Sequence, residues 1–215
     1  KSITTPHAPF LYLPNIIGYA RVALLIVALS TALSNPSNTM FYYLLSFFMD
    51  AVDGMSARWL NQESNLGGLL DMLTDRVATL GLLFVLSHIY PSTYLPYFVF
   101  FAALDVTSHW ARMLESAKRG LHHKAPVKRE SLHPFLDKIN LVKVYYGNKL
   151  FFGYCCLAAE MFWVACYYLA FVDEGSVGWK RGRGFVIYGV GLGWVVKQVT
   201  NLQQLLVSCA AFDKV

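Results

Sequence analysis

The sequence has little charge for its length. Asp, Glu, Lys and Arg make up 14% of the 215 residues, whereas 56% are hydrophobic. An ordinary soluble domain carries about 25% charged residues, so this composition argues against one and favours helices that face lipid. Aromatic residues, 15% of the chain, suit the two interfaces of a membrane, where Trp and Tyr gather.

Cysteines and processing signals are also scarce. The four cysteines, Cys155, Cys156, Cys166 and Cys209, lie in apolar stretches, and none has the C-x2-C spacing of a zinc site. We therefore expect them to be reduced and packed. The one N-x-[S/T] tripeptide begins at Asn35 and is blocked as a glycosylation site by its proline. The first apolar stretch carries Arg21 and lacks a small-residue cleavage site, so we expect no cleavable signal.

Long apolar stretches are what the chain has instead. Six of them approach the roughly 20 residues that a helix needs to cross about 30 Å of hydrocarbon. Their ranges are 13–34, 39–60, 66–89, 93–115, 149–172 and 184–211, with breaks at 35–38, 90–92 and 173–176. Only helices and closed barrels satisfy backbone polar groups in lipid, and these lengths are helical. The sequence predicts an all-α, polytopic bundle of six transmembrane helices, forming one domain over residues 1–215.

Positive charge is unevenly distributed along the predicted loops. Nine of the 18 Lys and Arg residues fall between Arg112 and Lys149, mostly in the loop 116–148, whereas the loop between spans five and six has three. Cytoplasmic loops carry the excess of such residues, so we expect the termini and the long loop on the cytoplasmic side. The basic block suits anionic membrane lipids better than nucleic acid, which we do not expect as a partner. We expect His122, His123 and His133 to be solvated loop residues.

Four carboxylates interrupt this apolar chain. They are Asp50, Asp53, Asp71 and Asp75, within the pattern D-x2-D-G-x2-A-R-x8-G-x3-D-x3-D. A carboxylate at membrane depth costs several kcal/mol unless something offsets it, and four together require cations. Mg²⁺ and similar hard cations prefer oxygen ligands, so the pattern predicts a divalent metal site.

Helical spacing places the two pairs of aspartates on facing surfaces. The i,i+3 pair Asp50/Asp53 lies on one helix and the i,i+4 pair Asp71/Asp75 on the next, and the short turn 61–65 predicts that these helices are antiparallel neighbours. The active site is thus expected between spans two and three. Glycines at 54, 67 and 68 would give clearance, and Arg58 would hold phosphate through a charge-assisted fork. The alternative is a structural ion-pair network of Asp75 with Arg76 and Asp53 with Arg58, which leaves an excess of acid.

These residues match a known family at every fixed position of its motif. Asp50, Asp53, Gly54, Ala57, Arg58, Gly67, Asp71 and Asp75 resemble the pattern of the CDP-alcohol phosphotransferases, with eight fixed residues over 26 positions. The resemblance extends over roughly residues 10–125 to the eukaryotic phosphatidylinositol synthases of that family. It is carried there by the strings L-P-N-I-I-G-Y-A-R at 13–21, L-D-M-L-T-D-R at 70–76 and L-D-V-T-S-H-W at 104–110.

The resemblance implies an enzyme that transfers a substituted phosphate from a CDP-linked donor to an alcohol and releases CMP. For the phosphatidylinositol synthases the donor is CDP-diacylglycerol and the acceptor is myo-inositol. It implies that Asp50, Asp53, Asp71 and Asp75 hold two divalent cations, Mg²⁺ or Mn²⁺, and that Asp75 is also the general base. It places the donor against Asp50, Asp53, Gly54, Ala57, Arg58, Asp71 and, bordering the nucleotide, Asn15. It further implies a homodimer in the endoplasmic reticulum membrane.

Two further polar stripes are open to more than one interpretation. Asp105, Ser108, His109 and Arg112 share one face of span four, where they would contact inositol or instead form interhelical hydrogen bonds. Lys197, Asn201, Gln204 and Ser208 form a stripe on span six, which would contact a ligand, face water or form a dimer seam.

The motif leaves the acceptor and the function class open to two alternatives. A sister phosphotransferase would use glycerol 3-phosphate or serine, because the motif determines the donor better than the acceptor. A divalent-cation or proton transporter would also line a pathway with intramembrane acids, although the inverted repeats and broken helices common in transporters are not found in this sequence.

Overall fold

The computed structural model describes residues 8–118, 145 and 147–212, and within these ranges the chain is helical, with no strands. The all-α prediction is confirmed for this part of the chain. The chain divides into two compact units, Lys1–Ile89 and Tyr90–Val215. The prediction of a single domain over 1–215 stays a prediction.

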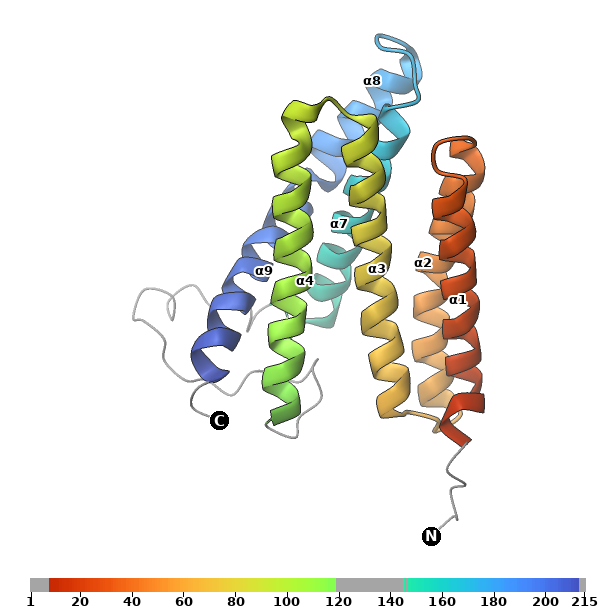
Figure 1. Cartoon of the computed structure of the whole chain (residues 1–215), viewed down its shortest axis with the longest axis vertical. Coiled ribbons are helices and arrows are strands. Elements are labelled where there is room, and N and C mark those ends of the chain that lie inside the picture. Colours follow the sequence, from red (N-terminus) through yellow and green to blue (C-terminus); the bar gives the residue numbers. More distant parts are fainter. Residues whose placement is uncertain (1–7, 119–144, 146, 213–215) are drawn as a thin grey trace. The chain divides into compact units, whose positions relative to one another are not determined.

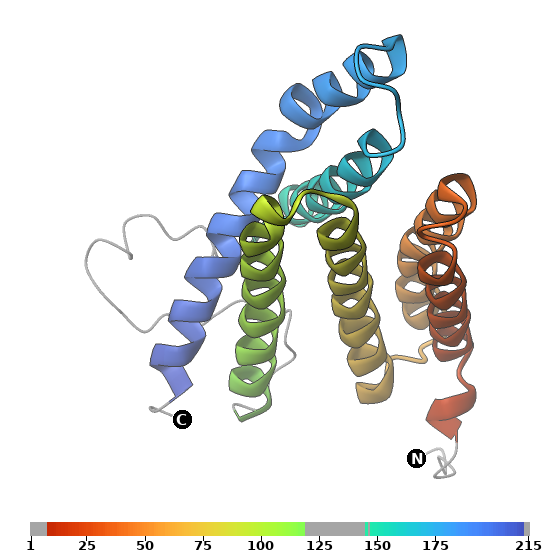
Figure 2. The ribbon, with the colours of Figure 1, turned by 45° about the horizontal axis from the view of Figure 1, so that its top comes forward.

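Unit 1 consists of a short 3-10 turn, Ala8–Leu11, and three helices, α1 (Leu13–Ser30), α2 (Pro36–Trp59) and α3 (Asn65–Ile89). Helix α1 lies along α2, side by side in both views (Figures 1 and 2), and also contacts α3. Helices α2 and α3 touch each other little. The predicted facing of the two helices holds for three of their aspartates, whose oxygens come within 4.8 Å of one another, although α1 provides most of the packing surface for both helices.

Helix α2 begins inside a segment that the sequence analysis treats as a break. Asn35 caps the helix, with its side-chain oxygen accepting from Asn38 N at 3.1 Å, and Pro36 is the first helical residue. Proline suits this position because its missing N–H has no partner in the first turn and its φ is already helical. The turn is therefore confined to residues 31–35, and the expected break over 35–38 is wrong.

The connection between α2 and α3 is short and capped at both ends. Asn61 has a φ of 51°, a left-handed conformation that asparagine adopts more readily than most residues. At the start of α3, Ser64 Oγ accepts from Gly67 N at 3.0 Å. Both helices meet at this turn, so its position sets how far from it the aspartates lie along α2 and along α3.

Glycines on α1 and α3 allow these two helices to approach closely. A Cβ at Gly18 would lie 2.5 Å from Leu70 Cδ2, and a Cβ at Gly81 would lie 2.5 Å from Leu29 Cδ1. Each leucine side chain therefore occupies the space over a glycine of the other helix. This packing sets the position of the middle of α1, including Arg21.

Unit 2 consists of the 3-10 turn Ser92–Tyr94 and the helices α4 (Leu95–Lys118), α7 (Lys149–Leu169), α8 (Val177–Gly184) and α9 (Gly191–Phe212), with a π-helical stretch Phe185–Val190 joining α8 to α9. Asn148 and Ser176 cap α7 and α8 through their side-chain oxygens. The sixth predicted span, 184–211, thus corresponds to the end of α8, the π-helical stretch and most of α9. Of the predicted loop 116–148, residues 116–118 form the end of α4, and most of the rest lies outside the described residues.

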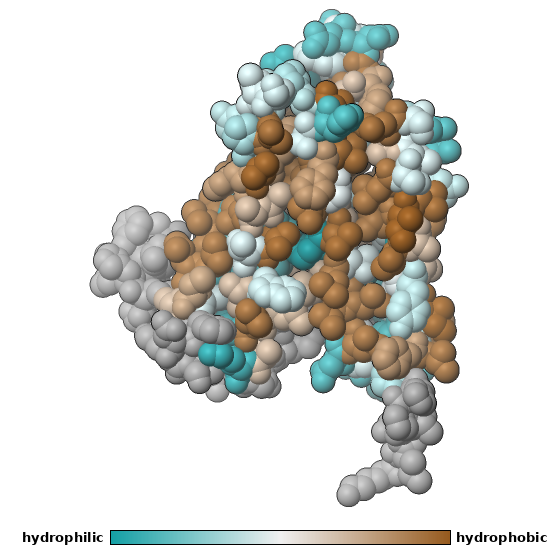
Figure 3. All heavy atoms as spheres, in the orientation of Figure 1, coloured by the Kyte–Doolittle hydropathy of each residue, from teal (hydrophilic) through white to brown (hydrophobic). Residues whose placement is uncertain are grey.

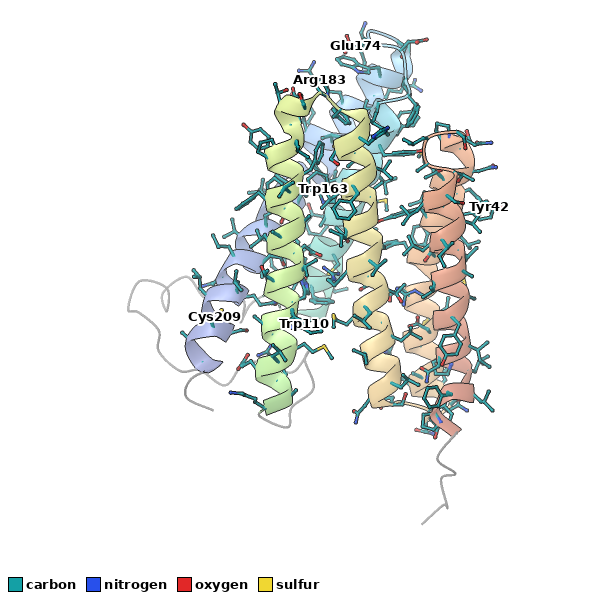
Figure 4. All side chains as sticks on the ribbon, viewed as in Figure 1. Tyr42, Trp110, Trp163, Glu174, Arg183 and Cys209 are labelled. Carbon is teal, nitrogen blue, oxygen red and sulfur yellow. The ribbon has the colours of Figure 1, made fainter. Side chains whose placement is uncertain are left out.

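The apolar packing of unit 2 is dominated by aromatic rings. Trp163, labelled in Figure 4, has ring contacts with Phe98, Phe101, Phe162 and Trp194, and the rings of Phe162 and Trp194 stack at 4.3 Å. This cluster joins α4, α7 and α9. All four cysteines are free, as expected, but Cys209 is exposed, so the expectation that all of them are packed is wrong for this one.

Two helices meet a strict test of length and apolar composition for crossing a membrane. They are Leu13–Ser30 and Leu150–Leu169, and only 33% and 39% of their apolar windows are buried. Most of each window therefore faces outward, unlike a core helix of a soluble protein. Figure 3 shows brown, apolar surface over the middle of the helices in each unit and more teal surface near helix ends. Among the other long helices, α2 and α3 carry the aspartates and α4 and α9 the polar stripes, which lowers their mean hydropathy.

Candidate active site

The four aspartates of unit 1 surround one arginine. Arg21 of α1 directs Nη1 to Asp50 Oδ1 at 2.8 Å, Asp53 Oδ2 at 2.7 Å and Asp71 Oδ1 at 3.6 Å. Its Nη2 lies 2.8 Å from Asp75 Oδ1. The Arg21 side chain is 2% exposed, whereas the carboxylates are 13% to 39% exposed. The structure thus brings together all four predicted aspartates, with a buried cation among them.

Three of the four carboxylates are close enough to share a metal ion. Asp50, Asp71 and Asp75 each offer one oxygen, and these oxygens lie within 4.8 Å of one another. Mg²⁺ binds oxygen ligands at about 2.0–2.1 Å, so carboxylate oxygens this close to one another suit such an ion. Four carboxylates with one guanidinium leave a formal charge of about −3. The donor set and its charge both fit divalent cations.

Arg21 is a site residue that the sequence did not single out. It is the one charged residue among the 18 of α1. An ionisable residue in the middle of an apolar helix points to function by the same reasoning that was applied to the aspartates. The charge in an apolar stretch is visible in the sequence. The helical faces of the second and third spans, however, do not show where a residue of the first span lies relative to them.

The donor-binding residues of α2 lie on the aspartate face and toward the end of the helix. Gly54 and Ala57 are partly buried, and Arg58 is exposed in the last turn. A Cβ at Gly54 would lie 3.5 Å from Arg58 Nη1, an ordinary contact, so the fold itself does not demand glycine there. In the structural-network alternative the partner of Asp53 differs from the predicted Arg58, because its described ion pair is with Arg21. Asp75 does lie near Arg76, at 3.8 Å.

Asn15 has a packing role in unit 1. It is 1% exposed, and its side-chain amide donates to Pro9 O and to Ser64 Oγ, which joins the start of α1 to the start of α3. A Cβ at Gly67 would lie 2.8 Å from Asn15 Oδ1. The motif glycine at 67 is therefore explained by helix packing, because it leaves room for this asparagine.

The predicted acceptor face of α4 is buried in unit 2 and is paired with α9. Asn201 Nδ2 donates to Asp105 Oδ1 at 3.5 Å, Gln204 Nε2 donates to the carbonyl of Ser108 at 3.0 Å, and Lys197 Nζ lies 3.4 Å from His109 Nε2. Arg112 Nη1 bonds Glu115 Oε2 at 2.6 Å, and Ser208 Oγ donates to the same oxygen at 3.3 Å. We call this set the α4–α9 seam: Asp105, Ser108, His109, Arg112, Glu115, Lys197, Asn201, Gln204 and Ser208.

The α4–α9 seam excludes one interpretation of the sixth-span stripe. Its four residues on α9 are all buried, between 1% and 5% exposed, so the water-facing interpretation is wrong. Interhelical hydrogen bonding is what these contacts display. Tyr145 joins the seam, since Lys197 Nζ donates to its hydroxyl at 2.7 Å and lies 4.8 Å from its ring centroid. Neither Glu115 nor Tyr145 was singled out from the sequence. His122, His123 and His133 lie outside the described residues.

The sequence is similar to one family of enzymes along most of its length. The model of the CDP-alcohol phosphatidyltransferase family matches residues 11–172. A probable CDP-diacylglycerol–inositol 3-phosphatidyltransferase 2 of Arabidopsis thaliana is 35% identical over 95% of this chain and 92% of its own length. The CDP-diacylglycerol–inositol 3-phosphatidyltransferases of Candida albicans and Homo sapiens are 34% and 33% identical, over 91% and 92% of this chain and 79% and 86% of their own lengths.

No solved structure matches the chain. The family match spans the helices that carry the four aspartates, Arg21 and the α4 half of the seam. With this match and the complete aspartate motif, the chain belongs to the CDP-alcohol phosphatidyltransferase family.

Proposed function

We propose that this protein is a CDP-diacylglycerol–inositol 3-phosphatidyltransferase, which makes phosphatidylinositol and CMP from CDP-diacylglycerol and myo-inositol. The observation that carries the proposal is the cluster of Asp50, Asp53, Asp71 and Asp75, drawn together in unit 1 with an excess of negative charge. Similarity to relatives that bear this name, over nearly the whole chain, supports inositol as the acceptor.

The donor half of the reaction is assigned to α2 and α3. Asp50, Asp53, Asp71 and Asp75 would hold two divalent cations, Mg²⁺ or Mn²⁺, and the close set Asp50, Asp71 and Asp75 supports this assignment. When bound, the cations would neutralise the diphosphate and the charge that develops on the CMP leaving group. Arg58, exposed in the last turn of α2, would bind phosphate, with Gly54 and Ala57 beside the cytidine. The packing contacts of Asn15 support only an indirect role at the nucleotide.

Asp75 is assigned the proton transfer. Its side chain is 36% exposed, so an incoming hydroxyl group can reach the carboxylate. In the proposed step the carboxylate accepts the hydroxyl proton of inositol while the hydroxyl oxygen bonds to the phosphorus of the phosphatidyl group. The bond from phosphorus to the CMP oxygen breaks, and CMP leaves with the electron pair. Arg21 Nη2, 2.8 Å from Asp75 Oδ1, orients this carboxylate.

The acceptor residues on α4 stay a prediction. Asp105, Ser108, His109 and Arg112 would supply the several donors and acceptors that a polyol needs, and all of them have polar contacts within unit 2. We propose that inositol binds by exchanging some of these contacts, with Asp105 and His109 as its nearest partners. Of the four, Arg112 is bonded to Glu115 at 2.6 Å and is the least available for such an exchange.

A membrane location follows from the same proposal. Six spans would correspond to α1, α2, α3, α4, α7 and α9, and the two clear candidates, α1 and α7, support this assignment. A helix such as α2, with 24 residues, is about 36 Å long, which is enough to cross the hydrocarbon. The diacylglycerol chains of the donor would then stay in lipid. The proposal further places the protein in the endoplasmic reticulum membrane, with its termini and active site on the cytoplasmic side. It also includes a homodimer.

The test offers the purified protein CDP-diacylglycerol with each alcohol in turn. We expect CMP release with myo-inositol in the presence of Mg²⁺ or Mn²⁺, and no release with glycerol 3-phosphate or serine. Release with one of the other alcohols and not with inositol would overturn the acceptor and keep the family chemistry. No CMP release with any alcohol, from folded protein, would overturn the proposal as a whole.

A further inference from the structure

Arg21 occupies the place where the carboxylates need a cation. We propose that Arg21 is an internal counter-ion: it holds the four aspartates together in the metal-free protein and competes with divalent cations for the same carboxylates. When the cations bind, its guanidinium gives up part of its contacts. This inference rests on the proposed metal site, and nothing in the family match assigns such a role to Arg21.

The guanidinium and a metal ion would use the same groups. Nη1 and Nη2 of Arg21 lie between 2.7 and 3.6 Å from one oxygen of each aspartate. Asp50, Asp71 and Asp75 of this set are also the carboxylates whose oxygens lie within 4.8 Å of one another. Because those three groups serve in both arrangements, full contact with Arg21 and full coordination of a cation exclude each other.

Charge and burial explain why the position is held by arginine. A guanidinium keeps its charge at any physiological pH, so Arg21 brings a permanent positive charge to a site where it is 2% exposed. The carboxylates reduce the cost of burying it, and it reduces their mutual repulsion. One guanidinium against four carboxylates still leaves an excess of negative charge, which is what admits further cations.

The side chain is held by its two terminal nitrogens alone. Nε of Arg21 is buried and has no hydrogen-bond partner among the residues that the structure describes. The backbone of Arg21 is anchored separately, because its carbonyl accepts from Ser46 Oγ of α2 at 3.0 Å. The guanidinium can therefore shift without moving α1, and the helix can keep its place when the side chain is changed.

Arg21→Gln and Arg21→Lys test the competition, and Arg76→Gln is the matched control. Arg76 lies next to Asp75 in the chain, and its Nη2 is 3.8 Å from Asp75 Oδ2, so the control removes a nearby positive charge that is farther from this carboxylate than Arg21 is. The measurements are Mn²⁺ affinity of the purified, substrate-free protein, by titration calorimetry, and its melting temperature in chelator and in Mn²⁺.

In Arg21→Gln we expect Mn²⁺ to bind at least about tenfold more tightly than in the unchanged protein, because the charge that opposes the cation is gone. We expect a lower melting temperature in chelator and a larger rise on adding Mn²⁺. Arg21→Lys, which keeps the charge but not the fork, should fall between. Arg76→Gln should show a smaller change in both quantities.

Unchanged or weaker Mn²⁺ binding in the Arg21 variants would overturn the proposal. If Arg21→Gln does not fold in chelator, it is purified in Mn²⁺, and the Mn²⁺ titration of Arg21→Lys becomes the test. Equal Mn²⁺ affinity of Arg21→Lys and the unchanged protein would then overturn the proposed competition between Arg21 and the cation. Failure of the metal site itself is distinct, since the unchanged protein would then bind no Mn²⁺ at all.

Discussion

The two units each bury a cluster of charged and polar side chains, and the clusters differ in how well they balance. In unit 1 four carboxylates share one arginine, and the acids are 13% to 39% exposed. In unit 2 the α4–α9 seam pairs Arg112 with Glu115 at 2.6 Å, and both side chains are at most 5% exposed. The first cluster has surplus charge that it can present to a ligand, whereas the ionic part of the second is neutralised within the chain.

This difference supports the proposal that the aspartate cluster binds a ligand and that the Arg112–Glu115 pair is structural. Buried charges are ordinarily paired within the protein, as Arg112 is with Glu115 Oε2. A cluster that keeps a net charge after all its internal pairs are counted remains costly until counter-ions or substrate arrive. Substitutions in the aspartate cluster should therefore reduce activity more than stability, and substitutions in the ionic part of the seam should do the reverse.

Asp75→Asn is expected to have the largest effect on activity. The amide cannot accept the proton of the attacking hydroxyl and is a poorer metal ligand, so CMP release should fall by about 10³-fold or more. Stability in chelator should change little, because losing the ion pair with Arg21 is offset by weaker repulsion among the acids. CMP release and the melting temperature of the purified variant check this.

Partial Mn²⁺ binding by Asp75→Asn is the control, since three aspartates remain. Retained CMP release in a folded Asp75→Asn protein would contradict the assignment of the base. An equally large loss of stability would remove the contrast with the seam.

Glu115→Ala is expected to have the largest effect on stability. It leaves Arg112 buried without its short partner, which costs about 3–5 kcal/mol. For a chain of this size that corresponds to a fall in melting temperature of about 10 °C. Glu174→Ala, an exposed acid in the connection between α7 and α8 (Figure 4), should leave the melting temperature nearly unchanged.

A double change, Arg112→Leu with Glu115→Leu, should recover part of the loss, because no unpaired charge stays buried. If Glu115→Ala instead lost activity at low temperature while its melting temperature stayed unchanged, the seam would be part of the active site.

Asp105→Asn tests whether the seam also binds the acceptor, with a smaller effect. The amide oxygen can still accept from Asn201, so stability should fall by about 1 kcal/mol or less. If inositol contacts Asp105, KM for inositol should rise about tenfold while KM for CDP-diacylglycerol changes less. Steady-state kinetics with each substrate varied separately measure the two constants. Equal changes in the two KM values, or a change only in the free energy of unfolding, would assign Asp105 to packing.

The sequence predicted the components of the site better than their arrangement. Five of the six predicted ranges match helices within a few residues, and the four aspartates do converge, since the spacing of residues along a helix determines which of them share a face. The close packing of α1 on both neighbours depends on Gly18, Gly81 and their leucine partners, which no helical wheel of a single span reveals. Arg21 was missed for this reason. The pairing of α4 with α9 joins residues about 90 positions apart, beyond the reach of local patterns.

The smallest effect comes from two motif glycines that the structure distinguishes. Gly54→Ala places a Cβ 3.5 Å from Arg58 Nη1, an ordinary contact, and alanine is the better helix former by about 1 kcal/mol. Stability should therefore hold or rise slightly, while KM for CDP-diacylglycerol rises several-fold because the methyl group fills space left for the nucleotide. Gly67→Ala places its Cβ 2.8 Å from Asn15 Oδ1, so it should lower the melting temperature by a few degrees. The two variants together compare ligand clearance with helix packing at one end of the same site. A loss of stability in Gly54→Ala, with KM unchanged, would place Gly54 with Gly67 as a packing residue and leave Arg58 as the nearest support for donor binding on α2.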